Sequence, residues 1–249
     1  MNGEHKLEEY HGAPDEQART ADLLRLIPGG YSTVLDAGAR DGYYSALLAN
    51  RFPAVTAIDL LKPKVNDSRV TCVEGDLTKM TFPDNSFDVV LCTEVLEHIP
   101  NVEMACREIM RVAKHVIVIG VPYLQDPRIG QVTCRQCGKT GPAWGHVNTF
   151  DETRLRNLFG SWKLTQTSFV GQNRERTNAL AAWLMDRGGN PYGIYENESC
   201  VHCGSRLQAP GRRGLGEKIC AALALRLTNI TTQMNQSHPN WIHMVFERP

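Results

Sequence analysis

The sequence predicts an α/β fold built on a mostly parallel sheet, and three observations support this prediction. Short apolar runs that suit buried strands alternate with amphipathic helical segments over roughly the first half of the chain. The first run enters a turn with glycines at Gly38 and Gly42 and continues into a helical pattern. Later runs end in acidic residues, and the carboxyl ends of parallel strands are where this kind of sheet binds ligands.

The glycine turn is the centre of the predicted site. Residues 34–45 (VLDAGARDGYYS) indicate a strand, a turn and the start of a helix. Glycine in such a turn lets the backbone approach a ligand closely, so we expect a nucleoside-bearing cofactor there. Arg40 stands where the dinucleotide-binding fingerprint has a second glycine, so the spacing differs from that fingerprint.

The following strands are predicted in order along the chain. Residues 54–59 form a second strand that ends at Asp59, about 20 residues beyond the turn, where a carboxylate can accept both ribose hydroxyls. A third strand begins at Val70 and reaches Asp76. A fourth, at 87–92, leads into the segment TEVLEHIP, and a fifth covers 115–121 after an amphipathic helix at 103–112.

Regular alternation stops after Pro122 and resumes between two insertions. A helix at 151–159 and a strand at 163–170 separate the insertions. The second insertion contains helices near 177–186 and 215–231, and the latter carries a stripe that we expect to pack inside the protein: Ile219, Leu223, Leu227 and Ile230. The predicted division is an N-terminal cap (1–30), a core (31–122, 146–171 and 238–249) and two insertions (123–145 and 172–237).

Each insertion contains a CxxCG unit. Four thiolates at this spacing suit a tetrahedral zinc ion and leave no open position for water, so the predicted zinc is structural. The predicted ligands are Cys134, Cys137, Cys200 and Cys203. Both insertions follow strands that leave the carboxyl edge of the sheet, and we therefore expect them to form a zinc-bound lid or substrate wall.

Composition narrows the classes of partner. The 249 residues carry 27 Lys and Arg against 27 Asp and Glu, and this neutral balance gives no long-range attraction for nucleic acid or an anionic membrane. The polar start of the chain lacks a secretory apolar core, and no run reaches membrane-spanning length. We expect a cytoplasmic protein with a small-molecule partner and without a membrane partner.

In four ordered motifs, DAGARDG, AID, EGDL and FDVVLCTEVLEHIP, the sequence resembles the class I S-adenosylmethionine-dependent methyltransferases. The resemblance covers roughly residues 23–170. It implies a Rossmann-like sheet of seven strands, with residues 241–247 as the antiparallel last strand and helices on both faces. It also implies an N-terminal segment that covers the cofactor.

The resemblance assigns S-adenosylmethionine to the glycine turn and to the strand ends beside it. Asp36 and Gly38 would lie by the methionine part, Asp59 would hold the ribose, and backbone at Cys92 would meet the methionine end. The remaining implied cofactor contacts are Ala37, Gly42 and Leu60, together with Asp76 and Leu77 beside the adenine.

Methyl transfer to a hydroxyl needs a base, and His98 and His146 are the candidates because both follow strands at the carboxyl edge. A helix-capping role for His98 and a loop-scaffold role for His146 stay open. Alternatively, the E-x-x-E-H spacing of Glu94, Glu97 and His98, joined by His146, resembles the divalent-metal site of some O-methyltransferases, and Mg²⁺ would then acidify the acceptor hydroxyl.

The leading hypothesis is therefore methyl transfer to O or N of a small molecule such as a sugar, a polyketide or another secondary metabolite. An RNA or protein methyltransferase is the second hypothesis, supported by basic residues in the insertions: Arg128, Arg135, Lys139, Arg174, Arg176, Arg206, Arg212 and Arg213. A non-catalytic scaffold that binds the cofactor is the third, because Arg40 departs from the usual turn.

Overall fold

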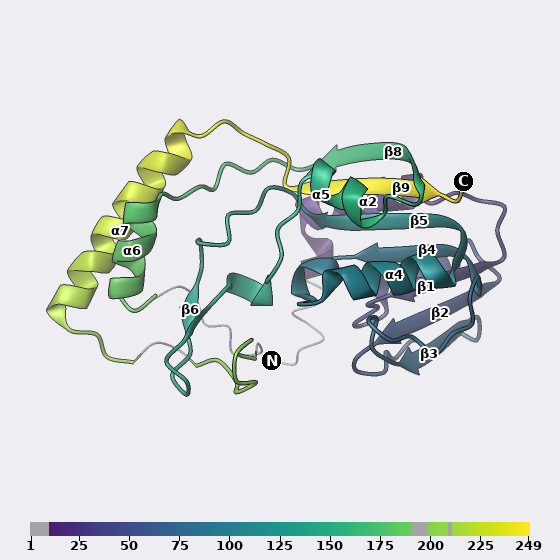
Figure 1. Cartoon of the computed structure of the whole chain (residues 1–249), viewed down its shortest axis with the longest axis horizontal. Helices are drawn as coiled ribbons and strands as arrows, with labels where there is room; N and C mark the ends of the chain where they lie inside the picture. Colours follow the sequence, from purple (N-terminus) through teal and green to yellow (C-terminus); the bar gives the residue numbers. More distant parts are fainter. Residues whose placement is uncertain (1–9, 191–198, 209–210) are drawn as a thin grey trace. The chain divides into compact units, whose positions relative to one another are not determined.

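The computed structural model describes residues 10–190, 199–208 and 211–249. The chain divides into two compact units, which are described separately (Figure 1). Unit 1 comprises Met1–Tyr123, Phe150–Gly171 and Pro239–Pro249, and unit 2 comprises Leu124–Thr149 and Gln172–His238. Among the described residues, no helix is long and apolar enough to cross a membrane.

Unit 1 is built on a seven-stranded sheet in the order β3-β2-β1-β4-β5-β9-β8 (Figure 1). Neighbours from β3 to β5 pair in parallel, whereas β9 runs antiparallel to both β5 and β8. The predicted sheet is thus confirmed, with these bounds: β1 Thr33–Ala37, β2 Ala54–Asp59, β3 Val70–Glu74, β4 Phe87–Thr93, β5 Ala113–Pro122, β8 Lys163–Val170 and β9 Trp241–Glu247.

Helices cover both faces of this sheet because the central strands are apolar on both sides. One face packs α4 and α5 over Ile117 and Met244, and the other packs α2 and α3 over Val34 and Val118. The helices are α2 Pro14–Leu26, α3 Tyr43–Leu48, α4 Val102–Val112 and α5 Glu152–Leu158, with a 3₁₀ turn, η1, at Leu96–His98. Asp151 is the N-cap of α5, and its carboxylate accepts the Arg154 N–H at 2.7 Å.

All connections to unit 2 leave unit 1 at one edge of the sheet. β5 and β8 both run antiparallel to β9, so they point in the same direction and end at the same edge as the parallel strands. Trp241 opens β9 opposite Pro122 and Val170, the last residues of β5 and β8. The two insertions therefore start and end at the carboxyl edge, where ligands bind in this architecture.

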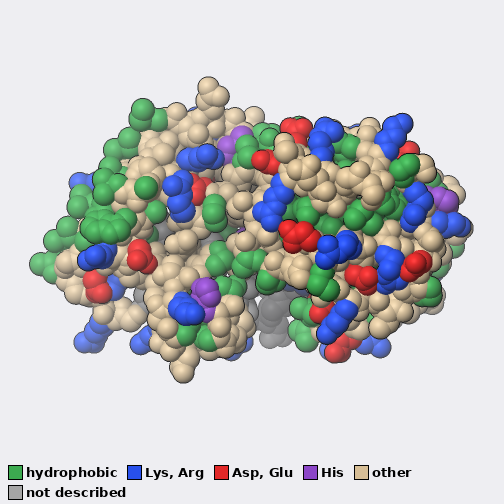
Figure 2. Space-filling view, in the orientation of Figure 1, with side chains coloured by type: hydrophobic (Ala, Val, Ile, Leu, Met, Phe, Trp, Pro, Cys, Tyr) green, Lys and Arg blue, Asp and Glu red, His purple; other side chains and the backbone are tan. Residues whose placement is uncertain are grey.

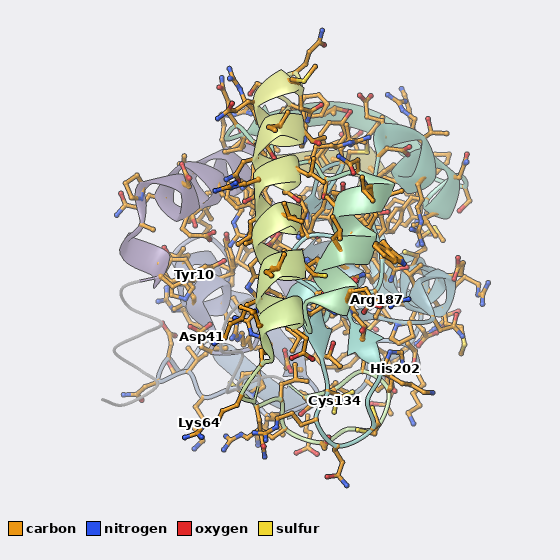
Figure 3. All side chains as sticks on the ribbon, turned by 90° about the vertical axis from the view of Figure 1, so that its left-hand side faces the viewer. Tyr10, Asp41, Lys64, Cys134, Arg187 and His202 are labelled. Atoms are coloured by element: carbon orange, nitrogen blue, oxygen red, sulfur yellow. The ribbon has the colours of Figure 1, made fainter. Side chains whose placement is uncertain are left out.

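Unit 2 contains a small hairpin and two long helices. The hairpin pairs β6 Val132–Thr133 with β7 Thr140–Gly141, and a 3₁₀ turn, η2, follows at Ala143–Gly145. The helices are α6 Ala179–Arg187 and α7 Leu215–Met234, which lie side by side (Figures 1 and 3). Asn178 caps α6 by accepting the Ala181 N–H at 2.9 Å.

The packing of α7 corrects one expectation. Ala221 and Ala224 are the residues buried against α6, and Gly188 allows this approach because a Cβ there would lie 2.8 Å from the Ala221 Cβ. Ile219, Leu223 and Ile230, which we expected in the interior, are 51%, 45% and 53% exposed. The helix packs through its small side chains, so its large apolar side chains lie outside.

Candidate functional site

The glycine turn follows β1 with a backbone path that only glycine tolerates at two points. Gly38 and Gly42 have φ values of 88° and 82°. A Cβ at Gly38 would lie 2.2 Å from a methyl carbon of Val95, and one at Gly42 would lie 2.1 Å from a methyl carbon of Val65. Arg40, with φ 46°, also adopts the left-handed conformation. The turn therefore fits closely against the segment after β4 at Gly38 and against the segment after β2 at Gly42.

Asp36 lies at the carboxyl end of β1 directly beneath this turn. It is 2% exposed, and the Ser45 hydroxyl on α3 donates to its carboxylate at 2.5 Å. Burial raises the pKa of Asp36 to about 7, and the nearby carboxylates of Asp41 and Asp59 act in the same direction. Burial thus disfavours the charged form of this carboxyl.

The acids at the next two strand ends adopt different arrangements. Asp59 ends β2, and its two oxygens accept the N–H groups of Arg40 at 2.9 Å and of Leu61 at 3.4 Å. Carboxylate oxygens can accept further hydrogen bonds, so Asp59 can still bind a diol. Asp76 accepts the backbone N–H and the hydroxyl of Thr78 on one oxygen, at 2.8 and 2.7 Å, and these bonds lower its pKa.

Of the other predicted cofactor residues, some are exposed and some are buried. Leu60 is 69% exposed beside Asp59, whereas Ala37 and Leu77 pack in the interior. Cys92 is fully buried in β4, and burial raises the pKa of its thiol well above the usual value. It is thus a neutral interior side chain, consistent with a contribution through its backbone only.

An arginine that the motif analysis missed lies next to this edge. Arg19 on α2 is 3% exposed and pairs with Glu16 on its own helix. Its Nη1 lies 3.1 Å from Oε1 of Glu94, the residue after β4, and its guanidinium lies 5.4 Å from the ring centroid of Trp241. Nε of Arg19 has no hydrogen-bond partner among the described residues. A buried guanidinium with an unused donor can receive an anionic group.

The N-terminal segment also contacts the glycine turn directly. The His11 ring stacks on Tyr43 with centroids 3.8 Å apart, and its Nε2 lies 2.9 Å from a carboxylate oxygen of Asp41. Thr20 on α2 is hydrogen-bonded to the Tyr44 hydroxyl at 3.2 Å. Because α3 carries both tyrosines, these contacts hold the segment before α2, and α2 itself, against the turn.

A second buried polar pair fixes α2 to β9. Nδ1 of His243, which is fully buried, lies 2.7 Å from Asp22, and the Ser168 hydroxyl donates to Asp22 at 3.0 Å. Burial lowers the pKa of His243, the Asp22 carboxylate raises it, and burial dominates. Burial thus favours the neutral form of the imidazole. Nothing in the sequence pattern pairs residues 22 and 243.

Glu97 and His98 lie in η1, which begins two residues beyond Glu94. Glu97 is completely buried, and neither of its carboxylate oxygens has a hydrogen-bond partner among the described residues. Burial, and then the Glu94 carboxylate, raises the pKa of Glu97 well above its usual range. A carboxylate oxygen of Glu97 and a ring nitrogen of His98 lie within 4.8 Å of each other. A buried polar group without a partner indicates a ligand or water at that position.

His146 belongs to unit 2, where its Nδ1 lies 2.7 Å from the side-chain oxygen of Gln125. Its ring centroid lies 6.0 Å from that of Trp144. His98 belongs to unit 1, so a joint role of the two histidines stays a prediction.

The two CxxCG units come together within unit 2. One ligand atom from each of the four predicted cysteines lies within 4.8 Å of the others. Sγ of Cys134 is 3.8 Å from Sγ of Cys203, and Sγ of Cys137 is 3.8 Å from Sγ of Cys200. Tetrahedral zinc with Zn–S bonds of about 2.3 Å places its thiolates about 3.8 Å apart. The donor set and its spacing fit zinc.

The two CxxCG turns have the same local geometry. In the first, the Gly138 N–H donates to the Cys134 carbonyl at 2.8 Å; in the second, Gly204 does the same to Cys200 at 2.8 Å. The two glycines have φ values of 69° and 71°. In addition, the Ser205 hydroxyl lies 3.0 Å from Sγ of Cys203. Each turn thus presents its two thiols on one side.

Comparisons with known proteins agree with this geometry. Residues 35–116 match the family model described as a methyltransferase domain. An uncharacterized methyltransferase of Mycobacterium bovis is 31% identical over 33% of this chain and 46% of its own length. The ubiquinone biosynthesis O-methyltransferase of Rickettsia typhi is 32% identical over 36% of this chain and 39% of its own length. The chain thus spans less than half of these curated relatives.

A solved structure extends the likeness in fold. The N-methyltransferase NodS of Bradyrhizobium japonicum, in complex with S-adenosyl-L-homocysteine, superposes with a TM-score of 0.52 at 15% identity, over 95% of this chain and 88% of that one. At this identity the likeness concerns the fold. Residues 35–116 thus match a methyltransferase domain, and the sheet order of unit 1 is that of the class I S-adenosylmethionine-dependent methyltransferase fold.

Proposed function

We propose that the protein transfers a methyl group from S-adenosylmethionine to O or N of a small molecule. The observation that carries the proposal is the close glycine turn at Gly38, with Asp36 beneath it and Asp59 at the neighbouring strand end. In this proposal, unit 2 carries a structural zinc ion that shapes the insertions into a substrate wall.

In this proposal, residues of unit 1 hold the ribose and the methionine part of the cofactor. Asp59 accepts the ribose hydroxyls, and the backbone at Gly38 approaches the ligand without a side chain in between. Arg19 holds the cofactor's carboxylate with its unused Nε donor, while Asp36, near the end of β1, lies by the methionine part. The bound cofactor supplies an electrophilic methyl group on a sulfonium, so the protein needs only to align the acceptor and exclude water.

Proton removal from a hydroxyl acceptor falls to His98 or His146 in this proposal. His98 is the last residue of η1, one residue beyond buried Glu97. Histidine titrates near working pH and therefore suits a general base. An amine acceptor that reaches the site as the free base needs no such group.

Calorimetry with S-adenosylmethionine tests the cofactor site. We expect micromolar affinity, and we expect Asp59→Ala to weaken binding at least about tenfold because the bonds to the ribose are lost. Asp67→Ala is the matched control, since that carboxylate pairs with Arg69. Absence of binding to the folded wild-type protein would favour a scaffold function, and equal losses in both variants would contradict the assigned site.

Metal analysis tests the zinc. We expect about one zinc per chain, and we expect Cys203→Ser to lower this content because a tetrahedral site needs four ligands. Cys220→Ser, a change on α7 outside the cluster, is the control and should keep the zinc. Hydrogen exchange should show that chelation loosens unit 2 while unit 1 still binds the cofactor. Zinc-free protein with an ordered unit 2 would refute the proposal.

A divalent metal at η1 is a second candidate, favoured by the buried, unpartnered carboxyl of Glu97 within 4.8 Å of His98. In this version His146 completes the ligand set and the metal acidifies an acceptor hydroxyl. Glu94 does not take part, because it forms an ion pair with Arg19.

Electron paramagnetic resonance with Mn²⁺ tests this candidate without an acceptor. We expect one bound Mn²⁺ per zinc-loaded chain and at least about tenfold weaker binding in Glu97→Gln, which loses a charged oxygen ligand. Glu103→Gln, at an exposed position of α4, should change nothing. Unchanged Mn²⁺ binding in Glu97→Gln, or none in the wild type, would exclude a metal held by Glu97.

A further inference from the structure

The outer face of α7 carries a continuous apolar stripe. The stripe consists of Leu215, Ile219, Leu223, Ile230 and Met234. Successive members are four, four, seven and four residues apart, so they lie on one side of the helix. In the same order, their side chains are 77%, 51%, 45%, 53% and 82% exposed. We call these five residues the α7 stripe. Figure 2 shows hydrophobic side chains gathered on the surface over α7.

The neighbouring helix adds apolar and aromatic surface. Leu180 and Trp183 on α6 are 57% and 53% exposed. The guanidinium of Arg187 lies 5.0 Å from the ring centroid of Trp183, and Figure 3 shows Arg187 at one end of α6, beside α7. A tryptophan stacked with an arginine suits a boundary between apolar and charged surroundings.

The α7 stripe is not needed to hold the two helices together. Their contact uses Ala221 and Ala224 on α7 with Met185 on α6, on a different side of α7. Apolar patches of this extent on a folded domain mark interaction surfaces. The α7 stripe is therefore free to contact a partner other than α6.

Charge narrows the choice of partner. Unit 2 has eleven Lys and Arg against six Asp and Glu, whereas unit 1 has sixteen against twenty-one. Two of the acids near the helices are engaged internally: Glu217 accepts the Gly214 N–H, and Asp186 accepts from the side chain of Asn190. Basic residues flank the helix pair at both ends: Arg174, Arg176, Arg187, Arg212, Arg213 and Lys218. The neutral total of the whole chain conceals this excess.

A second copy of the chain fits the α7 stripe poorly. Arg226 follows Leu223 by three positions and precedes Ile230 by four, so it lies within the stripe. Pairing two stripes would bring two guanidinium groups into one apolar interface, where like charges repel. An anionic surface, in contrast, receives Arg226 and the flanking cations directly.

We propose that α6 and α7 dock on the surface of a bilayer that contains anionic phospholipids. The α7 stripe enters the boundary between headgroups and acyl chains, with the helix in the plane of the surface. Trp183 lies at headgroup depth, and the arginines reach lipid phosphates, each contributing to the attraction. No helix needs to cross the bilayer for this mode of binding.

Vesicle sedimentation with the full-length, zinc-loaded protein tests the proposal. We expect at least about tenfold stronger partitioning onto phosphatidylglycerol-containing vesicles than onto pure phosphatidylcholine, and weaker partitioning at high salt. Leu223→Gln with Ile230→Gln should reduce partitioning about tenfold through lost apolar burial. Arg212→Gln with Arg213→Gln should reduce it only on anionic vesicles. Met104→Gln, at an exposed apolar position of unit 1, is the control.

Three outcomes would overturn the proposal. One is absence of partitioning while zinc content and circular dichroism show a folded protein. Another is self-association in sedimentation velocity that Leu223→Gln with Ile230→Gln abolishes, which would assign the stripe to a second copy. A third is tighter binding to single-stranded RNA that depends on Arg212 and Arg213 but not on Leu223 and Ile230, which would assign the basic residues to a nucleic acid.

Discussion

Parallel pairing of β1 with β2 and with β4 is the constraint on which the site depends. It brings three strand ends to one edge, so that Asp36, Asp59 and the segment after β4 become neighbours although 58 residues separate Asp36 from Glu94. The turn after β1 can close against Val95 only because Gly38 has no side chain. A site of this kind follows from sheet geometry first and from individual side chains second.

The same geometry explains what could be predicted from the sequence. Most strands were predictable because they are short apolar runs, and β2, β8 and β9 have the predicted bounds. The cysteine pairs were predictable because a CxxCG turn fixes the spacing of two thiols locally. Bringing the two CxxCG turns together then requires only that both insertions begin at one edge of the sheet.

Long-range polar contacts escaped prediction because they leave no periodic signal. Arg19 shares a helix face with Leu23 and Leu26, which could have identified it as a buried cation, but its partner Glu94 could not be inferred. His243 stands within an apolar strand, and its contact with Asp22 spans almost the whole chain. The exposed stripe of α7 was misassigned because periodicity identifies a face of a helix and does not say which face is covered.

The net charge of the whole chain likewise does not show how charge is distributed between the two units. A neutral sum predicts weak attraction to any polyanion, yet the insertions carry a positive excess and the sheet unit an equal negative one. The distribution of charge between the two units, rather than its total, bears on which surfaces unit 2 can contact.

A crystal structure of the zinc-loaded protein with S-adenosylhomocysteine would test the central claim most directly. We predict that the ribose hydroxyls bind Asp59, that the adenine lies beside Asp76 and Leu77, and that the amino acid end lies between Gly38 and Arg19. A ligand bound elsewhere, or a glycine turn closed over by the side chain of Arg40 with no ligand at saturating concentration, would contradict it.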